Sequence, residues 1–498
     1  MTSWRSRGVV VSGSVAACAV VVGGAAFGLA LFNGLSSGSQ PAAVVPSSAF
    51  AYASVDLDPS MRQKLGAFRL FNTFPAAKKA VSESDSAQVV FGVGQQLAEG
   101  LGPVDYARDV KPWLGRRGGV ALLPPVTAGG APVTVVALQV KDREVAERSL
   151  STFEGFSGRA GSLSYVFDRD YVVVVPRKAK DAVQSQLSGG RLADHEAFVS
   201  DVAALGERGV ATAWVNHAGV AQFAGSGLVK KSGLVGHTAG TLRFAADRAE
   251  FASVTRGVDL PDEGVATRVS DLPGDTGALL SSVNGGELVE RWWPALKGLV
   301  NIPGLPIKEG LQAVSARTGF TVPGFVATLL GGQVDVAAGK EQVDVVLGRQ
   351  SVRGLFSGGG QIPEVTFRAK TKDPQATLRS VNSTLVELFG PLGALIPHQV
   401  SGDRVLAGPH IQHLRSVASP NVKNPLGAGD VFRSVVNPAE AVAELAYIDF
   451  DAFEDQYLQE LPAQYRSGVK ALRALGVSRT PVKSGQFSLV VRLSVNEG

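Results

Sequence analysis

The longest apolar segment of the chain runs from Gly8 to Phe32 and contains no charged residue. Arg5 and Arg7 precede it, and the next charge is Asp56. A helix rises about 1.5 Å per residue, so about 20 apolar residues cross the hydrocarbon core of a bilayer. Residues 8–32 are therefore predicted to form one transmembrane helix. Because positive charges favour the cytoplasmic side, residues 1–7 are predicted to be cytoplasmic and residues 33–498 extracytoplasmic at the plasma membrane.

Two other interpretations of this segment stay open. A cleavable signal peptide has an apolar region of about 7–15 residues, which is shorter than this one. The string VAAC, which ends at Cys18, has the form of a lipoprotein signal, but apolar or small residues continue from Cys18 to Phe32. An uncleaved signal anchor is the preferred prediction, and lipidation of Cys18 is left undecided.

The pattern after this segment predicts alternating strands and helices. Residues 33–46 contain Gly, Ser and Pro and are predicted to be a linker. Period-two alternation or short apolar runs predict strands over 49–58, 118–124, 133–140, 163–167, 171–175, 210–215, 241–245 and 250–255. Helical spacing predicts helices over 61–71, 89–101, 142–153, 178–187 and 197–205. The run YVVVV at 171–175 needs cover on both faces or on one deep face.

The same pattern starts again near residue 272. Three landmarks recur at offsets of 231, 233 and 234: Asp142 with Asp373, Asp170 with Asp403, and Phe198 with Phe432. Near-constant offsets indicate an internal repeat. The fold class is therefore predicted to be α+β, with one N-terminal transmembrane helix followed by two duplicated units with mostly antiparallel sheets. These units are predicted to cover residues 47–265 and 266–498.

Composition narrows the classes of function. Hydrophobic residues make up 45% of the chain and charged residues 18%, which is typical of a folded protein with real cores. The net charge of +4 comes without a basic stripe interleaved with aromatic residues, so nucleic acid is not predicted as a partner. The single cysteine, Cys18, excludes an internal disulfide and a thiolate metal site in the outer region.

Two pairs of aspartates and one tryptophan are the candidate site residues. Asp56 with Asp58, and Asp449 with Asp451, are spaced for one face of a strand, where paired carboxylates bind a cation or perform acid–base chemistry. Aspartates at strand ends also accept backbone N–H bonds in turns and caps, and this second reading is favoured. Trp113 either lines a ligand cleft or packs in the core.

The remaining patterns give no cofactor and no metal. His410 and His413 have the spacing of one helical face but no third ligand, so they are predicted to be surface histidines at a helix start. Glycine-rich strings lack the strand–helix context of a nucleotide site. No catalytic set is predicted, and the protein is expected not to be an enzyme.

Several strings resemble a known family. The run from Val55 to Pro59, the run DVKPWLG at 109–115 and the run LPGDT at 272–276 carry the resemblance. The chain resembles an uncharacterised, membrane-anchored actinobacterial family, the domain of unknown function three-three-five-two. The resemblance implies an N-terminal helix and an extracytoplasmic domain, and it implies no activity, ligand or catalytic residue.

Three hypotheses for function follow. The leading one is a membrane-tethered, non-enzymatic binding or scaffold module of the cell envelope, with an envelope protein or another envelope component as its partner. The second is a carrier or sensor of an apolar ligand such as a lipid, because the strands are rich in Val, Leu and Phe. The third is an envelope hydrolase that uses the paired aspartates.

Overall fold

The computed structural model describes residues 39–74, 105–154, 163–223, 234–258, 269–283, 333–340, 364–371, 373–419, 422–437, 442–454, 458, 463–483 and 485–496. The chain divides into two compact units, Met1–Val258 and Asp259–Gly498. The predicted transmembrane helix 8–32, the predicted helix 89–101 and the predicted boundary at 265 lie outside the described residues. Within the described part, no helix is both long and apolar enough to cross a membrane.

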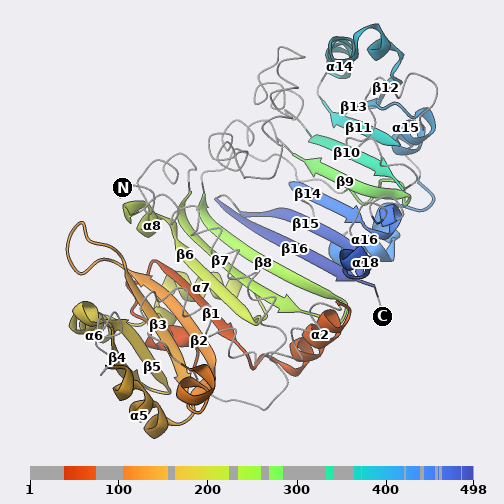
Figure 1. Cartoon of the computed structure of the whole chain (residues 1–498). Helices are drawn as coiled ribbons and strands as arrows, with labels where there is room; N and C mark the ends of the chain where they lie inside the picture. Colours follow the sequence, from red (N-terminus) through yellow and green to blue (C-terminus); the bar gives the residue numbers. More distant parts are fainter. Residues whose placement is uncertain are drawn as a thin grey trace. The chain divides into compact units, whose positions relative to one another are not determined.

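Among its described residues, the first unit has eight antiparallel strands with helices packed against them (Figure 1). Its strands are β1 Ala51–Asp56, β2 Leu114–Leu123, β3 Val133–Val140, β4 Leu163–Asp168, β5 Tyr171–Pro176, β6 Ala211–Asn216, β7 Leu234–Phe244 and β8 Arg248–Val258. Its helices are η2 Pro41–Val44, α2 Met61–Asn72, η3 Tyr106–Val110, α5 Arg143–Glu154, η5 Arg177–Ala179, α6 Lys180–Gly189, η6 Leu192–Asp194, α7 Glu196–Ala204 and α8 His217–Phe223. The strands lie in the order β4-β5-β3-β2-β1-β6-β7-β8.

The second unit also contains eight strands among its described residues. They are β9 Thr276–Ser282, β10 Gln333–Gly339, β11 Val365–Lys370, β12 His398–Ser401, β13 Arg404–Ala407, β14 Glu444–Asp449, β15 Leu472–Lys483 and β16 Gln486–Val495. Its helices are α14 Pro374–Phe389, η7 Gly390–Leu395, α15 Ile411–Ala418, η8 Leu426–Ala428, α16 Asp430–Val435, η9 Asp451–Phe453 and α18 Ala463–Lys470. The order is β12-β13-β11-β10-β9-β14-β15-β16. An α+β fold with antiparallel sheet is thus confirmed.

When the strands of each unit are numbered from one to eight along the chain, both units have the same order across the sheet: 4-5-3-2-1-6-7-8. Local hydrogen bonds match as well. Asp142 Oδ1 accepts the N–H of Val145 at 3.0 Å, and Asp373 Oδ1 accepts the N–H of Ala376 at 2.9 Å. Each aspartate caps the N-terminus of a helix that follows the third strand of its unit.

The YVVVV run is buried on both faces, as its composition requires. Tyr171, Val173 and Val175 pack in one apolar cluster with η2, α6 and α7. Val172, on the opposite face, packs in a second cluster with Trp113. Strand β5 is therefore packed between two apolar clusters, one on each face.

The predicted linker 33–46 ends earlier than the sequence indicated. Residues 41–44 form η2, and Ala42, Val44 and Val45 belong to the main apolar cluster. Ser39 Oγ also donates a hydrogen bond to Asp170 Oδ1 at 2.8 Å. These alanines and valines are small enough to fill the core beneath the sheet, so the folded unit already includes residue 39.

A buried polar row crosses three strands of the second unit. Asp335 on β10 lies opposite Ser281 of β9 and Arg368 of β11 in the strand register. Its carboxylate accepts from Ser281 Oγ at 2.6 Å and from Arg368 Nε at 2.8 Å, and both Asp335 and Arg368 are buried. The same register positions of the first unit hold Ser54, Gly119 and Ala137. The fold therefore accepts either an ion pair or small residues at these positions.

Two histidines are buried and held neutral. His217 Nε2 lies 2.8 Å from Thr238 Oγ1, and His413 Nδ1 lies 2.8 Å from Thr366 Oγ1. Burial lowers the pKa of each imidazole from 6.5 to about 4. The sequence-based expectation that His413 is a surface residue is wrong, because a threonine on β11 gives its ring a buried partner. His410 is the N-cap of α15 and accepts the N–H of His413.

Because His217 and His413 are buried with lowered pKa values, we predict that the protein loses stability in acid. The unfolded chain binds protons at each imidazole below about pH 6.5, whereas the folded chain does not until about pH 4. The free energy of unfolding should therefore fall as the pH drops through this window, by at most about 3 kcal/mol per histidine. Unfolding midpoints of the full chain at pH values across the window measure this. His413→Asn keeps a polar atom near Nδ1 but does not titrate, so it should flatten the curve; an unchanged curve would contradict the prediction.

Candidate functional site

Asp56 and Asp58 lie close together, but both are bound to their own chain. Asp56 Oδ1 accepts the N–H of Asp58 at 2.8 Å, and Oδ2 accepts from Arg117 Nε at 2.9 Å. Asp58 lies beyond the end of β1 and forms an ion pair with Lys64 in the first turn of α2. The two aspartates therefore hold the turn between β1 and α2. Asp56 accepts a backbone N–H there, which is the role that the sequence favoured.

The other sequence candidates have structural partners too. Asp449 Oδ2 lies 3.0 Å from Lys340 Nζ, and its Oδ1 accepts the N–H of Ala452 at 3.4 Å. Asp451 lies in η9 rather than on the strand, and accepts from Asn496 Nδ2 at 2.9 Å. Trp113 is 1% exposed, and its Nε1 donates to Asp109 O at 2.7 Å. Within the described ranges, no group of three His, Cys, Asp or Glu residues could hold a metal ion.

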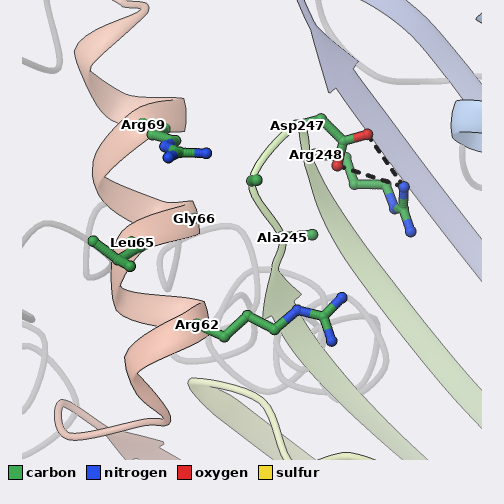
Figure 2. Close-up of a pocket in the computed structure, with 8 residues that line it drawn as sticks. Arg62, Leu65, Gly66, Arg69, Ala245, Asp247 and Arg248 are labelled. Atoms are coloured by element: carbon green, nitrogen blue, oxygen red, sulfur yellow. Dashed lines mark hydrogen bonds and ion pairs between the residues drawn. The ribbon is translucent and has the colours of Figure 1, made fainter.

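A groove of about 360 Å³ lies between α2 and the turn that joins β7 to β8. Figure 2 shows Arg62 and Arg69 extending from α2 toward this turn, with the Asp247–Arg248 pair opposite them. Its lining residues are Arg62, Leu65, Gly66, Arg69, Ala245, Ala246, Asp247 and Arg248.

The groove carries excess positive charge. Arg62 and Arg69 are seven residues apart, which is two helical turns, so both point to the same side of α2. Asp247 lies 3.3 Å from Arg248 and is the one carboxylate among the described lining residues, which together carry a net charge of +2 (3 − 1). Guanidinium groups bind phosphate and carboxylate through paired N–H donors. This chemistry suits an anionic ligand.

Helix α2 also exposes an apolar stripe, formed by Met61, Leu65 and Phe68, which are 60%, 47% and 47% exposed. The opposite face of α2 is buried although it contains polar residues. Gln63 Nε2 donates to Arg208 O at 2.6 Å, and Lys64 pairs with Asp58. Gln63 and Lys64 thus share the buried face with Leu70, while Met61, Leu65 and Phe68 face outward.

Gly66 sets how closely α2 approaches the turn. A Cβ at this position would lie 2.4 Å from the carbonyl oxygen of Ala245. No side chain fits in that distance, so glycine permits the contact that forms the floor of the groove.

Gly66→Ala should therefore destabilise the protein or displace α2. In a helix, alanine is ordinarily more stable than glycine by about 0.5–1 kcal/mol, so the sign at Gly66 is reversed by the clash. Gly189→Ala in α6 is a matched control, because a Cβ there meets nothing within 4 Å. Thermal unfolding of both variants tests this. Equal stabilisation by the two substitutions would contradict the close approach.

A second polar cluster lies against α7 in the first unit. Asp201, which is 1% exposed, accepts from Trp214 Nε1 at 2.9 Å, and its Oδ1 lies 2.7 Å from Arg256 Nε. His237 stacks on Trp214, with ring centroids 5.4 Å apart, and its Nδ1 lies 4.0 Å from Asp201 Oδ2. The ring of His195 meets the Trp214 ring edge-on, with centroids 5.9 Å apart. In this cluster Arg256 balances the negative charge of the buried Asp201 carboxylate, and Arg256 and His237 are themselves partly exposed.

The second unit has apolar or small residues at the corresponding positions. Phe198 contacts Trp214 in the first unit as Phe432 contacts Tyr447 in the second. Three residues after each phenylalanine stand Asp201 and Val435. In the strand register, His237 and Arg256 correspond to Ala474 and Ser494. The ion pair is therefore a feature of the first unit alone and not of the shared strand order.

Arg256→Ser should destabilise the protein by about 3 kcal/mol, because it leaves the Asp201 carboxylate buried without its cation. Adding Asp201→Val should recover part of this loss, because the buried charge is then removed and only the indole N–H lacks a partner. Denaturant unfolding of the single and double variants measures the difference. A double variant less stable than Arg256→Ser would show that Asp201 does not depend on Arg256.

A comparison with known protein families gives a match for part of the chain. Residues 9–163 match the model of a family described as "Protein of unknown function (DUF3352)". This segment contains α2, with Arg62 and Arg69, but not Arg248. No curated protein and no solved structure matches the chain. The actinobacterial and membrane-anchored character of the family stays a prediction. Over residues 9–163 the chain thus matches the domain of unknown function DUF3352, which confirms the resemblance predicted from the strings at 55–59 and 109–115; the string at 272–276 lies outside the match.

Proposed function

We propose that this protein is a membrane-tethered, extracytoplasmic and non-enzymatic module of the cell envelope that binds an anionic ligand in the groove beside α2. The observation that carries this proposal is that Arg62, Arg69 and Arg248 all line one groove of about 360 Å³, in which Asp247 is the one carboxylate among the described lining residues. Because Arg248 is paired with Asp247, Arg62 and Arg69 supply the positive charge that an anion would neutralise.

The tether rests on the apolar segment 8–32 and on Arg5 and Arg7 before it. The family match starts at residue 9, so the apolar segment is part of what is shared with that family. In this proposal the body outside the membrane consists of two duplicated units. The identical strand order and the matched caps at Asp142 and Asp373 support duplication.

A carrier or sensor of an apolar ligand is the second candidate. The exposed apolar stripe of Met61, Leu65 and Phe68 favours it, because Leu65 also lines the groove. The valine-rich strands that first motivated this candidate pack in the core clusters instead. An envelope hydrolase has less support, because Asp56, Asp58, Asp449 and Asp451 are bound to their own chain.

The groove should bind a small soluble anion such as sn-glycerol 3-phosphate. A charge-assisted hydrogen bond contributes about 1.5–3 kcal/mol, so the double variant Arg62→Gln/Arg69→Gln should weaken binding by about 100-fold or more. Calorimetric titration of the full chain in detergent measures the affinity. Arg177→Gln is the control, because Arg177 is an exposed arginine of the same unit outside the groove. Equal affinity of the native chain and the double variant would refute the proposed site.

A further inference from the structure

The folded body starts very close to the predicted membrane helix. That helix ends at Phe32, and the first described residue, Ser39, is already bonded to Asp170. Seven peptide units of fully extended chain reach at most about 25 Å. If residues 8–32 span the membrane, the part of the first unit around residue 39 lies within that distance of the end of the membrane helix.

The chain joins the folded body beside α2. Gln40 Nε2 donates to Asp56 Oδ2 at 3.3 Å, at the end of β1. Two residues later, Asp58 forms the ion pair with Lys64 in the first turn of α2. Contacts through Asp56 and Asp58 thus connect Gln40, which is close in sequence to the predicted membrane helix, to the start of α2. The β2–β3 turn lies at the opposite end of β1, because Ala51 pairs with Leu122 and Asp56 with Arg117.

The exposed surface of α2 has the composition of a helix that lies on an anionic bilayer. Such helices combine a row of apolar side chains with arginines or lysines beside them. In α2 the row contains Met61 and Leu65, and the flanking cations are Arg62 and Arg69. Arg248 adds a third cation across the groove. The apolar side chains would enter the boundary of the acyl chains while the arginines stay at the level of the phosphates.

We infer that α2 docks on the surface of the membrane that holds the tether, with the headgroup of an anionic phospholipid in the arginine groove. This inference rests on the proposed function and names its ligand. The charge of the groove selects anionic over zwitterionic lipid, the exposed stripe explains why the ligand is a bilayer lipid, and the short connection to residue 32 places α2 near it. Each arginine near an anionic surface strengthens docking about fivefold.

The test places an environment-sensitive fluorophore on α2 of the full chain. The chain carries Cys18→Ala and Met61→Cys, is labelled at residue 61, and is reconstituted in nanodiscs of phosphatidylcholine with or without phosphatidylglycerol. Docking should shift the emission to shorter wavelength and expose the label to quenching by nitroxide-labelled lipid, only in the anionic discs. Arg62→Gln/Arg69→Gln should lower the docked-to-undocked ratio about 25-fold, and salt should weaken docking.

Val126→Cys in the same Cys18→Ala chain is the matched control. Val126 is 50% exposed in the β2–β3 turn, so its label should stay in water in both kinds of disc. Quenching of residue 61 equal to that of residue 126 would overturn the inference. If the chain still binds sn-glycerol 3-phosphate in that case, the proposed anion site stands and only the lipid surface is refuted. If neither binds, both fail.

Discussion

The carboxylate of Asp56 is the interaction on which the geometry of the first unit's candidate site depends. It binds Arg117 of β2, Gln40 of the N-terminal segment and the N–H of Asp58 in the following turn. These bonds fix the turn that starts α2, and Asp58 then fixes Lys64. The position of α2 against the β7–β8 turn, and with it the groove, follows from this arrangement. The residue that sequence reasoning chose as a candidate acid or cation ligand thus has a positioning role.

The sequence predicted the elements well, because their periodicity is local. The strands predicted over 118–124, 133–140, 163–167, 171–175 and 210–215 and the helix predicted over 142–153 all form close to their expected bounds. What it could not predict was which face of α2 is buried. Leu65 and Phe68 look like core positions by spacing, but Gln63 and Lys64 take the inner face, because Arg208 O and Asp58 satisfy them. Those partners come from other segments, and no local pattern reveals them.

The groove was missed for a similar reason. Arg62 and Arg69 are visible in the sequence as a pair two helical turns apart, yet Arg248 is 179 residues further along the chain (248 − 69). Only the pairing of β7 with β8, and the close approach that Gly66 permits, brings them together. His413 shows the same limit in the second unit, since Thr366 on a distant strand determines its burial. The two units also place their buried ion pairs differently, at Asp201 in one and Asp335 in the other. Local capping and periodicity are thus common to both, while the charged core positions are particular to each.

The short connection between residues 32 and 39 has a consequence for affinity. A site held within about 25 Å of a surface meets that surface at an effective concentration in the millimolar range or above. A groove of this kind does not need tight intrinsic binding, because tethering replaces the entropy that a free protein would lose on association. Weak, exchangeable contacts would then keep α2 at the bilayer for most of the time, and would still release it when the local lipid charge changes.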